Sequence, residues 1–210
     1  MLKLYDFAAA PSPRRARIFL AEKGIEHENI QVDLRTAAQL SDEFRAVNPR
    51  CTVPALVTED GHTICENLAI AAYLEDYKPS PPLMGKSIIE KARILEWNWR
   101  IEFEGLSAVA EILRNSSPHM KDRAMTGPHN IEQLPELAER GRQRLGYFFE
   151  DLNAQLTKST FVAGDSYSFA DISALVTADF LKWVKAQPDA SLTALHTWHE
   201  KAAARPASKA

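Results

Sequence analysis

The sequence predicts a mixed α/β domain followed by an all-helical domain, and three observations lead to this fold class. Residues 1–77 alternate short apolar runs with helical patterns in the order β-α-β-α-β-β-α, which is typical of a mixed sheet with helices on its faces. The segment Lys78-Pro79-Ser80-Pro81-Pro82 then interrupts the pattern as a linker does. Every periodic pattern after it is helical. We therefore expect a domain over residues 1–78, a linker over 79–86 and a helical domain over 87–210.

Composition excludes several classes of protein. The chain has 210 residues and a formal net charge of −3, which gives no reason to expect a nucleic acid as partner. No apolar run approaches the roughly 18 residues that a membrane span needs, so no membrane partner is expected. The start of the chain, Met1 to Asp6, lacks the pattern of an export signal, which indicates a cytoplasmic protein. The two cysteines show no metal-binding spacing, so no metal is expected.

The first domain begins with a predicted strand over residues 2–7 and a tight loop over 8–13. Ser12 followed by Pro13 is a helix-start signal, with serine as N-cap and proline at the first helical position. This helix is expected to end at Gly24, a natural residue for the left-handed position after a helix. A second strand is expected over residues 28–32.

The second half of this domain contains a hairpin between two helices. A short helix over residues 40–47 is stopped by Asn48-Pro49. Strands over 55–59 and 62–65 flank Asp60-Gly61, a strong turn pair. The next helix runs over 68–77, and Asn67 is expected to be its N-cap.

The helical domain shows four main segments. A long helix over residues 91–113 carries two apolar stripes, so it is expected to be covered on more than one side, by its own bundle and by a partner subunit. Residues 115–130 are expected to form a loop with a short helix over 121–125. Helices follow over 137–156, 168–183 and 192–202. The helix over 168–183 starts with a capping box of Ser168 and Asp171.

The stretch around Val53-Pro54 carries the first functional signal. Proline cannot donate to a sheet ladder and belongs at the first residue of a strand, here before Ala55-Leu56-Val57. If the Val53-Pro54 bond is cis, the N–H and C=O groups of Val53 face outward and can pair with an extended peptide. Ten residues later, the helix start at Asn67 favours a carboxylate, and Glu66 suits an ammonium group. Together these residues can bind a peptide backbone and an amino-acid head group.

These motifs resemble those of the cytosolic glutathione S-transferases, in the bacterial type with a serine or asparagine in the first loop. The resemblance rests on Thr52-Val53-Pro54-Ala55-Leu56, Glu66-Asn67 and the segment from Ala163 to Asp171, and it covers nearly the whole chain. It implies a thioredoxin-like first domain that binds glutathione as co-substrate. It also implies a helical domain that contributes the pocket for the electrophile, and a homodimer.

Glutathione reacts as a thiolate, so the site needs a hydrogen-bond donor near the sulfur. Lowering a thiol pKa by two units takes roughly 3 kcal/mol, which one or two charge-assisted hydrogen bonds can supply. The family places its donor in the first loop after strand one, but Ala10 stands where many serine-type relatives carry a hydroxyl. Ser12 is therefore the candidate catalytic residue, helped by the helix dipole, Arg14 and Arg15. The alternatives are that Ser12 only caps the helix, or that Tyr5 is the donor, although its place in the strand favours packing.

The resemblance also implies contacts to the glycine end of glutathione. Gln39 matches a position that often contacts this carboxylate, and Thr52 and Arg50 are within reach, although Arg50 is as readily a solvated surface charge. Cys51 is expected to be idle and Cys65 to belong to the core.

Other polar or aromatic side chains give weaker signals. His196 and His199 lie three residues apart, but no third ligand is near them in the sequence. Trp97, Trp99 and Arg100 line an electrophile pocket or simply pack in the helical domain.

Three functions remain open at this point. The leading one is a detoxifying transferase that adds glutathione to small electrophiles. A glutathione-dependent disulfide reductase or peroxidase needs the same pocket, and Ala10 keeps this alternative open. A glutathione-binding stress or scaffold protein with little turnover is the third.

Overall fold

A computed structural model describes all residues, Met1 to Ala210, and the chain forms two compact units. The first unit holds Met1–Pro81 together with Met125–His129 and Ala210, and the second holds Pro82–Ala124 and Asn130–Lys209. The change from one unit to the other after Pro81 falls inside the predicted linker; the exact linker bounds, 79–86, stay a prediction. None of the helices is both long enough and apolar enough to cross a membrane.

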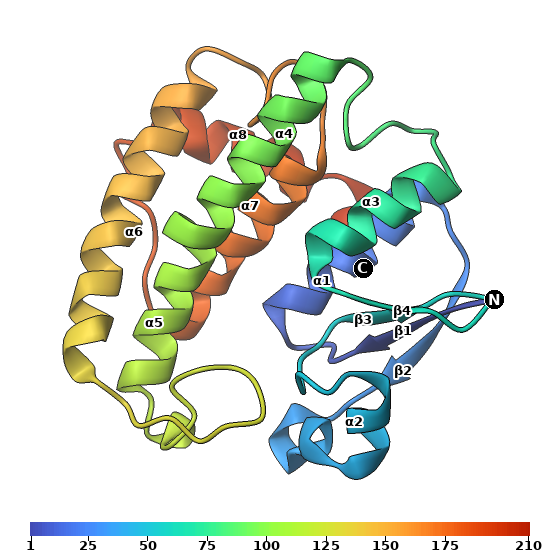
Figure 1. Ribbon diagram of the computed structural model, residues 1–210. Helices are drawn as coiled ribbons and strands as arrows, with labels where there is room; N and C mark the ends of the chain where they lie inside the picture. The colour runs from blue at the N-terminus through green and yellow to red at the C-terminus, as the bar shows by residue number, and fades with distance from the viewer. The chain divides into compact units, whose positions relative to one another are not determined.

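A four-stranded mixed sheet forms the centre of the first unit (Figure 1). Its strands, in the spatial order β2-β1-β3-β4, are β2 (His27–Gln31), β1 (Leu2–Asp6), β3 (Ala55–Val57) and β4 (Thr63–Cys65). Strands β1 and β2 are parallel, whereas β3 is antiparallel to both β1 and β4. A parallel neighbour requires a crossover, which helix α1 (Pro11–Lys23) provides. The predicted mixed sheet is confirmed.

The turns of this unit follow the predicted chemistry. Gly24 adopts the left-handed conformation (φ 57°) that ends α1, and Gly61 (φ 87°) forms the β3–β4 turn. Two 3₁₀ turns, Leu34–Thr36 and Ala38–Leu40, precede helix α2 (Asp42–Val47). Ser41 caps α2 by accepting the Phe44 N–H at 3.2 Å. Helix α3 (Asn67–Tyr77) lies beside α1 (Figure 1).

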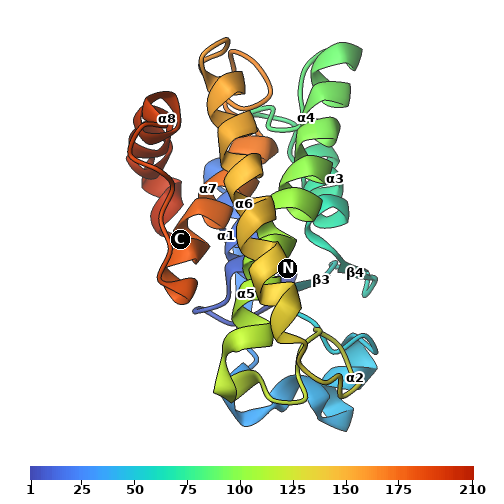
Figure 2. The ribbon, with the colours of Figure 1, turned by 90° about the vertical axis from the view of Figure 1, so that its left-hand side faces the viewer.

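The second unit is a bundle of helices, as predicted (Figure 2). Its elements are α4 (Ile88–Arg100), a π-helical segment (Ile101–Leu106), α5 (Ser107–Ser116), a 3₁₀ turn (Pro118–Met120), α6 (Pro135–Leu156), α7 (Phe169–Phe180), a 3₁₀ turn (Leu181–Val184), α8 (Thr193–Ala203) and a final 3₁₀ turn (Pro206–Lys209). Helix α6 packs on α5, and α8 packs on α6 and α7. The prediction of a short helix over residues 121–125 is wrong, because the only helical turn in this loop is Pro118–Met120.

The long helix predicted over residues 91–113 is confirmed, with a π-helical segment in its middle that periodicity did not reveal. Gly105 lies in this segment, and a Cβ there would approach the Phe148 ring to 2.7 Å. Gly141 of α6 packs similarly, because a Cβ there would lie 2.9 Å from the Ala108 carbonyl oxygen. The two glycines therefore let α6 pack closely against the π-helical segment and α5.

The two apolar stripes of this helix differ in burial. One is buried in the bundle: Trp97, Ile101, Val109 and Ile112. The other is open at its N-terminal end, where Leu95, Trp99 and Phe103 are 44%, 67% and 56% exposed. Rings of Trp99 and Phe103 stack in parallel with centroids 5.7 Å apart. The predicted double covering therefore holds on only one side within a single chain.

The start of α7 is held by a fully buried carboxylate. Asp171 accepts hydrogen bonds from the N–H groups of Val162 and Ser168 and from the Trp198 indole, each at 2.9 Å. The predicted capping box with Ser168 is confirmed. Burial raises the pKa of Asp171 to about 6, against the lowering effect of these donors.

Candidate functional site

Helix α1 starts one residue before Ser12, so the prediction that Ser12 caps it is wrong. Pro11 is the first helical residue, and Ala10 is the N-cap without any side-chain hydrogen bond. Pro11 and Pro13 have no N–H, so two of the first three helical positions need no acceptor. A capping side chain would therefore find few free N–H groups to bind. The hydroxyl of Ser12, at the second helical position, is left available for another contact.

That contact joins the starts of two helices. The side-chain amide of Asn67 donates to Ser12 Oγ at 2.9 Å, across 55 positions of sequence. Arg15, one turn further along α1, donates to the same oxygen at 3.3 Å. Asn67 is the first residue of α3 and not its N-cap, which corrects the second capping prediction. It is only 6% exposed, and its Oδ1 has no hydrogen-bond partner.

Glu66 is the actual N-cap of α3 and has a strained backbone. Its φ of 73° with ψ of 127° lies where residues other than glycine are rarely found, and such strain is often held at functional sites. Its exposed carboxylate lies 3.7 Å from the Arg50 guanidinium, so the segment before Val53 and the start of α3 are next to each other. Both side chains are largely exposed, so a role of Arg50 at the site stays a prediction.

The chain around Val53 has the features that peptide pairing requires. The Val53–Pro54 peptide bond is cis, and neither the N–H nor the C=O of Val53 has a hydrogen-bond partner. Asn48, 1% exposed, holds the preceding loop: its amide donates to the Thr52 carbonyl at 2.8 Å and to Thr52 Oγ1 at 3.1 Å. The Arg50 N–H donates back to Asn48 Oδ1 at 3.0 Å. One buried side chain thus shapes the whole loop.

Gln39 stands apart from these contacts. It lies in the 3₁₀ turn Ala38–Leu40, and its Oε1 is buried without a hydrogen-bond partner. The structure joins Ser12 to Asn67 and Arg50 to Glu66, but no hydrogen bond links Gln39 to any of them. A buried, unsatisfied amide oxygen is costly and calls for a hydrogen-bond donor. A carboxylate is an acceptor, so the contact predicted for Gln39 would have to use its Nε2 group.

Tyr5 packs against other side chains of the first unit, as its position in the strand predicts. Its ring lies against Phe44 of α2 with centroids 5.8 Å apart. Both belong to a cluster with Val32 and Val53. Tyr5 therefore packs against the same cluster that holds Val53.

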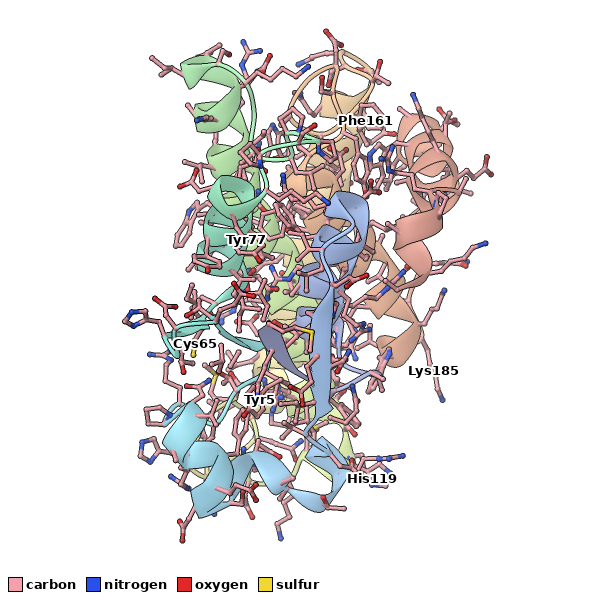
Figure 3. All side chains as sticks on the ribbon, turned by 90° about the vertical axis from the view of Figure 1, so that its right-hand side faces the viewer. Tyr5, Cys65, Tyr77, His119, Phe161 and Lys185 are labelled. Atoms are coloured by element: carbon pink, nitrogen blue, oxygen red, sulfur yellow. The ribbon has the colours of Figure 1, made fainter.

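The two thiols of the chain lie in different surroundings. Cys51 is buried, and its Sγ donates weakly to the Pro49 carbonyl at 3.6 Å. Cys65, at the end of edge strand β4, is only partly buried and not in the core as expected (Figure 3). Burial raises its pKa, and the charge of Glu66 raises it further. A raised thiol pKa means less thiolate and a weaker nucleophile.

The remaining candidates lie in the second unit. His196 bonds to the Asp189 carbonyl at 2.9 Å and His199 to the Asp179 carboxylate at 3.0 Å, and no group of three metal-ligating residues is present. Trp97 is buried, with the Arg100 guanidinium 4.5 Å from its ring centroid. A role for Trp97, Trp99 or Arg100 in an electrophile pocket stays a prediction.

Comparison with known proteins identifies the family. Residues 10–77 match the model of the glutathione S-transferase N-terminal domain, and residues 112–206 match that of the C-terminal domain. Glutathione S-transferase 2 of Saccharomyces cerevisiae is 32% identical over 98% of this chain and 87% of its own length. The chain belongs to the glutathione S-transferase family.

Solved structures and a further relative agree with this assignment. A glutathione S-transferase domain-containing protein of Marinobacter aquaeolei superposes on this transferase with a TM-score of 0.91 and 32% identity, covering 98% of this chain and 99% of the other. The disulfide-bond oxidoreductase YfcG of Escherichia coli is 26% identical over 99% of this chain and 93% of its own length. The two-domain fold and the membership in this enzyme family are therefore established.

Sequence reasoning missed the role of Asn48 in the transferase's candidate site, and it named Arg15 only as a nearby charge and not as a hydrogen-bond partner of Ser12. The role of Asn48 has a partial signal, since Asn-Pro after a helix favours a structured turn. The contact of Arg15 with Ser12 follows from their spacing of three on one helix, once the true helix start is known.

Proposed function

We propose that this transferase binds glutathione in its first unit and activates it through Ser12 for attack on small electrophiles. The observation that carries the proposal is the hydrogen bond from Asn67 to Ser12, because it places a hydroxyl and the start of α3 at one point. Family membership supports the reaction type, and the local geometry supports the residues.

In the proposed complex, glutathione lies along the segment before β3. Its backbone pairs with the free N–H and C=O of Val53, next to Pro54, as an added antiparallel strand. Its glutamyl end binds at the start of α3, where Asn67 and the helix N–H groups suit the carboxylate and Glu66 suits the ammonium. We assign the glycyl carboxylate to three polar side chains: Gln39, Arg50 and Thr52.

Activation in this proposal is a matter of stabilising the thiolate. The Ser12 hydroxyl donates to the sulfur, and the positive end of the α1 dipole adds to this. The thiol proton is released to solvent. The thiolate then attacks the electrophilic carbon, the carbon–sulfur bond forms, and the leaving group departs with its electron pair.

Replacing Ser12 with alanine tests this assignment. We expect S12A to lower the rate of chlorodinitrobenzene conjugation at least about tenfold and to raise the pH at which bound glutathione ionises, since one charge-assisted hydrogen bond contributes about 1.5–3 kcal/mol. S168A is a matched control outside the site, and we expect it to reduce the yield of folded protein but not the activity per folded molecule. Unchanged kinetics in S12A would remove Ser12 from the activating role.

A glutathione-dependent disulfide reductase is the second candidate, favoured by the similarity to YfcG along nearly the full chain. Reduction would begin with the same thiolate, which attacks one sulfur of the disulfide and expels the other as a thiolate. Assays with hydroxyethyl disulfide and with chlorodinitrobenzene, run on the same preparation, separate the two reactions. Binding to immobilised glutathione without either activity would support a scaffold or stress-protein role.

The assembly we propose is a homodimer formed by the open apolar stripe that runs from α4 into the π-helical segment. Leu95, Trp99 and Phe103 repeat every four residues and form one exposed apolar face. Exposed apolar patches of this kind mark protein–protein interfaces. Sedimentation velocity of the wild type and of W99E tests it: the wild type should sediment as a dimer and the variant more slowly. A monomeric wild type would refute the proposal. The cytoplasmic location stays a prediction from the sequence.

A further inference from the structure

The Ser12 hydroxyl has an unusual set of neighbours. Its oxygen receives two hydrogen bonds, at 2.9 Å from Asn67 Nδ2 and at 3.3 Å from Arg15 Nη2. Arg15 is 5% exposed, so its guanidinium acts where the effective dielectric constant is low. No acceptor for the hydroxyl hydrogen is present within the protein.

The direction of the hydroxyl proton follows from this arrangement. A serine oxygen has two acceptor lone pairs and a single hydrogen. With both lone pairs filled by donors, the hydrogen points away from Asn67 and Arg15. A charged donor on the oxygen also polarises the O–H bond and makes it a stronger donor in turn.

We propose that Arg15 is a positioning residue that sets the orientation and donor strength of the Ser12 hydroxyl toward the substrate sulfur. This inference rests on the proposed role of Ser12 as the group that contacts the thiol. Arg15 would act through Ser12 and not through a general electrostatic field. The distinction matters because Arg14 lies in the same turn of α1 and carries the same charge, without a hydrogen bond to Ser12. At the start of α3, the charged groups are Glu66 and its partner Arg50.

The test compares matched variants by titrating the thiolate of bound glutathione through its ultraviolet absorbance. We expect R15M to raise the pKa of the bound thiol by about one unit, a tenfold loss of thiolate at low pH, and R14M to shift it by less than about 0.3 units. In the S12A background, R15M should have no further effect, because two residues that act as a unit are not additive. The KM for glutathione should change less than kcat.

The outcomes separate this inference from the proposal on which it rests. If S12A leaves the bound thiol pKa unchanged, the activating role of Ser12 fails. If S12A raises it but R15M does not, or R15M and R14M raise it equally, only the role of Arg15 is overturned. A full R15M effect in the S12A background would likewise overturn it. Should R15M not fold, R15Q keeps a polar side chain there and is expected to shift the pKa in the same direction.

Discussion

Lys23 is a buried cation at the end of α1, and its replacement tests what holds the first unit to its linker. Its side chain is fully buried, and its ammonium has three acceptors at 2.7 Å: the Glu75 carboxylate of α3, the Lys78 carbonyl and the Pro81 carbonyl. The three N–H groups of an ammonium are thus all used. One side chain ties α1 to α3 and to the start of the linker.

We expect K23M to lower the free energy of unfolding by about 3–5 kcal/mol, the range for removing one partner of a buried ion pair. Methionine fills a similar volume, so the loss comes mainly from desolvated acceptors. Two carbonyls left without a donor cost roughly 1–3 kcal/mol each, and relaxation toward water recovers part of this. Because whole proteins unfold with about 5–15 kcal/mol, the variant should be clearly less stable.

Denaturant titration followed by far-ultraviolet circular dichroism measures this loss. All four tryptophans lie in the second unit, so their fluorescence reports that unit separately. K78M is the matched control, because Lys78 is exposed and donates one hydrogen bond, to the Gly24 carbonyl at 2.9 Å. We expect it to cost less than about 1 kcal/mol. Equal losses in the two variants, or a K23M loss below that of K78M, would refute the reasoning.

Two further predictions concern other buried polar groups. N48A should raise the KM for glutathione several-fold with little change in kcat, because the loop before Val53 loses the hydrogen bonds of Asn48. Steady-state kinetics measures both constants, and a selective fall in kcat would contradict the prediction. Asp171 has a folded-state pKa of about 6, above its ordinary 3.8, so its contribution to stability is greatest below pH 4 and is lost as the pH rises through 6. Relative to D171N, the wild type should gain up to roughly 3 kcal/mol between pH 7 and pH 4, measured by denaturant titration at each pH. A constant difference would show that the carboxylate does not titrate there.

The order of elements could be predicted because local signals specify it. The Asp60-Gly61 pair, Gly24 and the proline-rich linker each restrict the backbone by their own stereochemistry, and the structure follows all three. The π-helical segment was not predicted, and within it Gly105 packs closely on Phe148 from another helix. Tertiary contacts of that kind leave no local pattern.

The candidate site also has one part that the sequence predicts and one part that it does not. The cis peptide bond before Pro54 and the cluster at the start of α3 have sequence signals within a few residues. The pairing of Ser12 with Asn67 has none, because it depends on how α1 and α3 lie beside each other. The exact helix starts were also ambiguous, since Pro11 and Pro13 both satisfy the rule for a first-turn proline.

The start of α1 at Pro11 determines what the Ser12 oxygen can bind. A serine that caps its own helix uses its oxygen to accept a backbone N–H in the next turn, and its orientation is then set by the helix. Here the prolines remove two of those N–H groups, and Ala10 takes the cap position. The Ser12 oxygen therefore accepts from two side chains, the amide of Asn67 in α3 and the guanidinium of Arg15 one turn further along α1. Ala10 has no hydroxyl to donate to a thiol. Pro11 and Pro13, in the same short segment, leave the Ser12 hydroxyl free of a capping role, so that it can donate its proton.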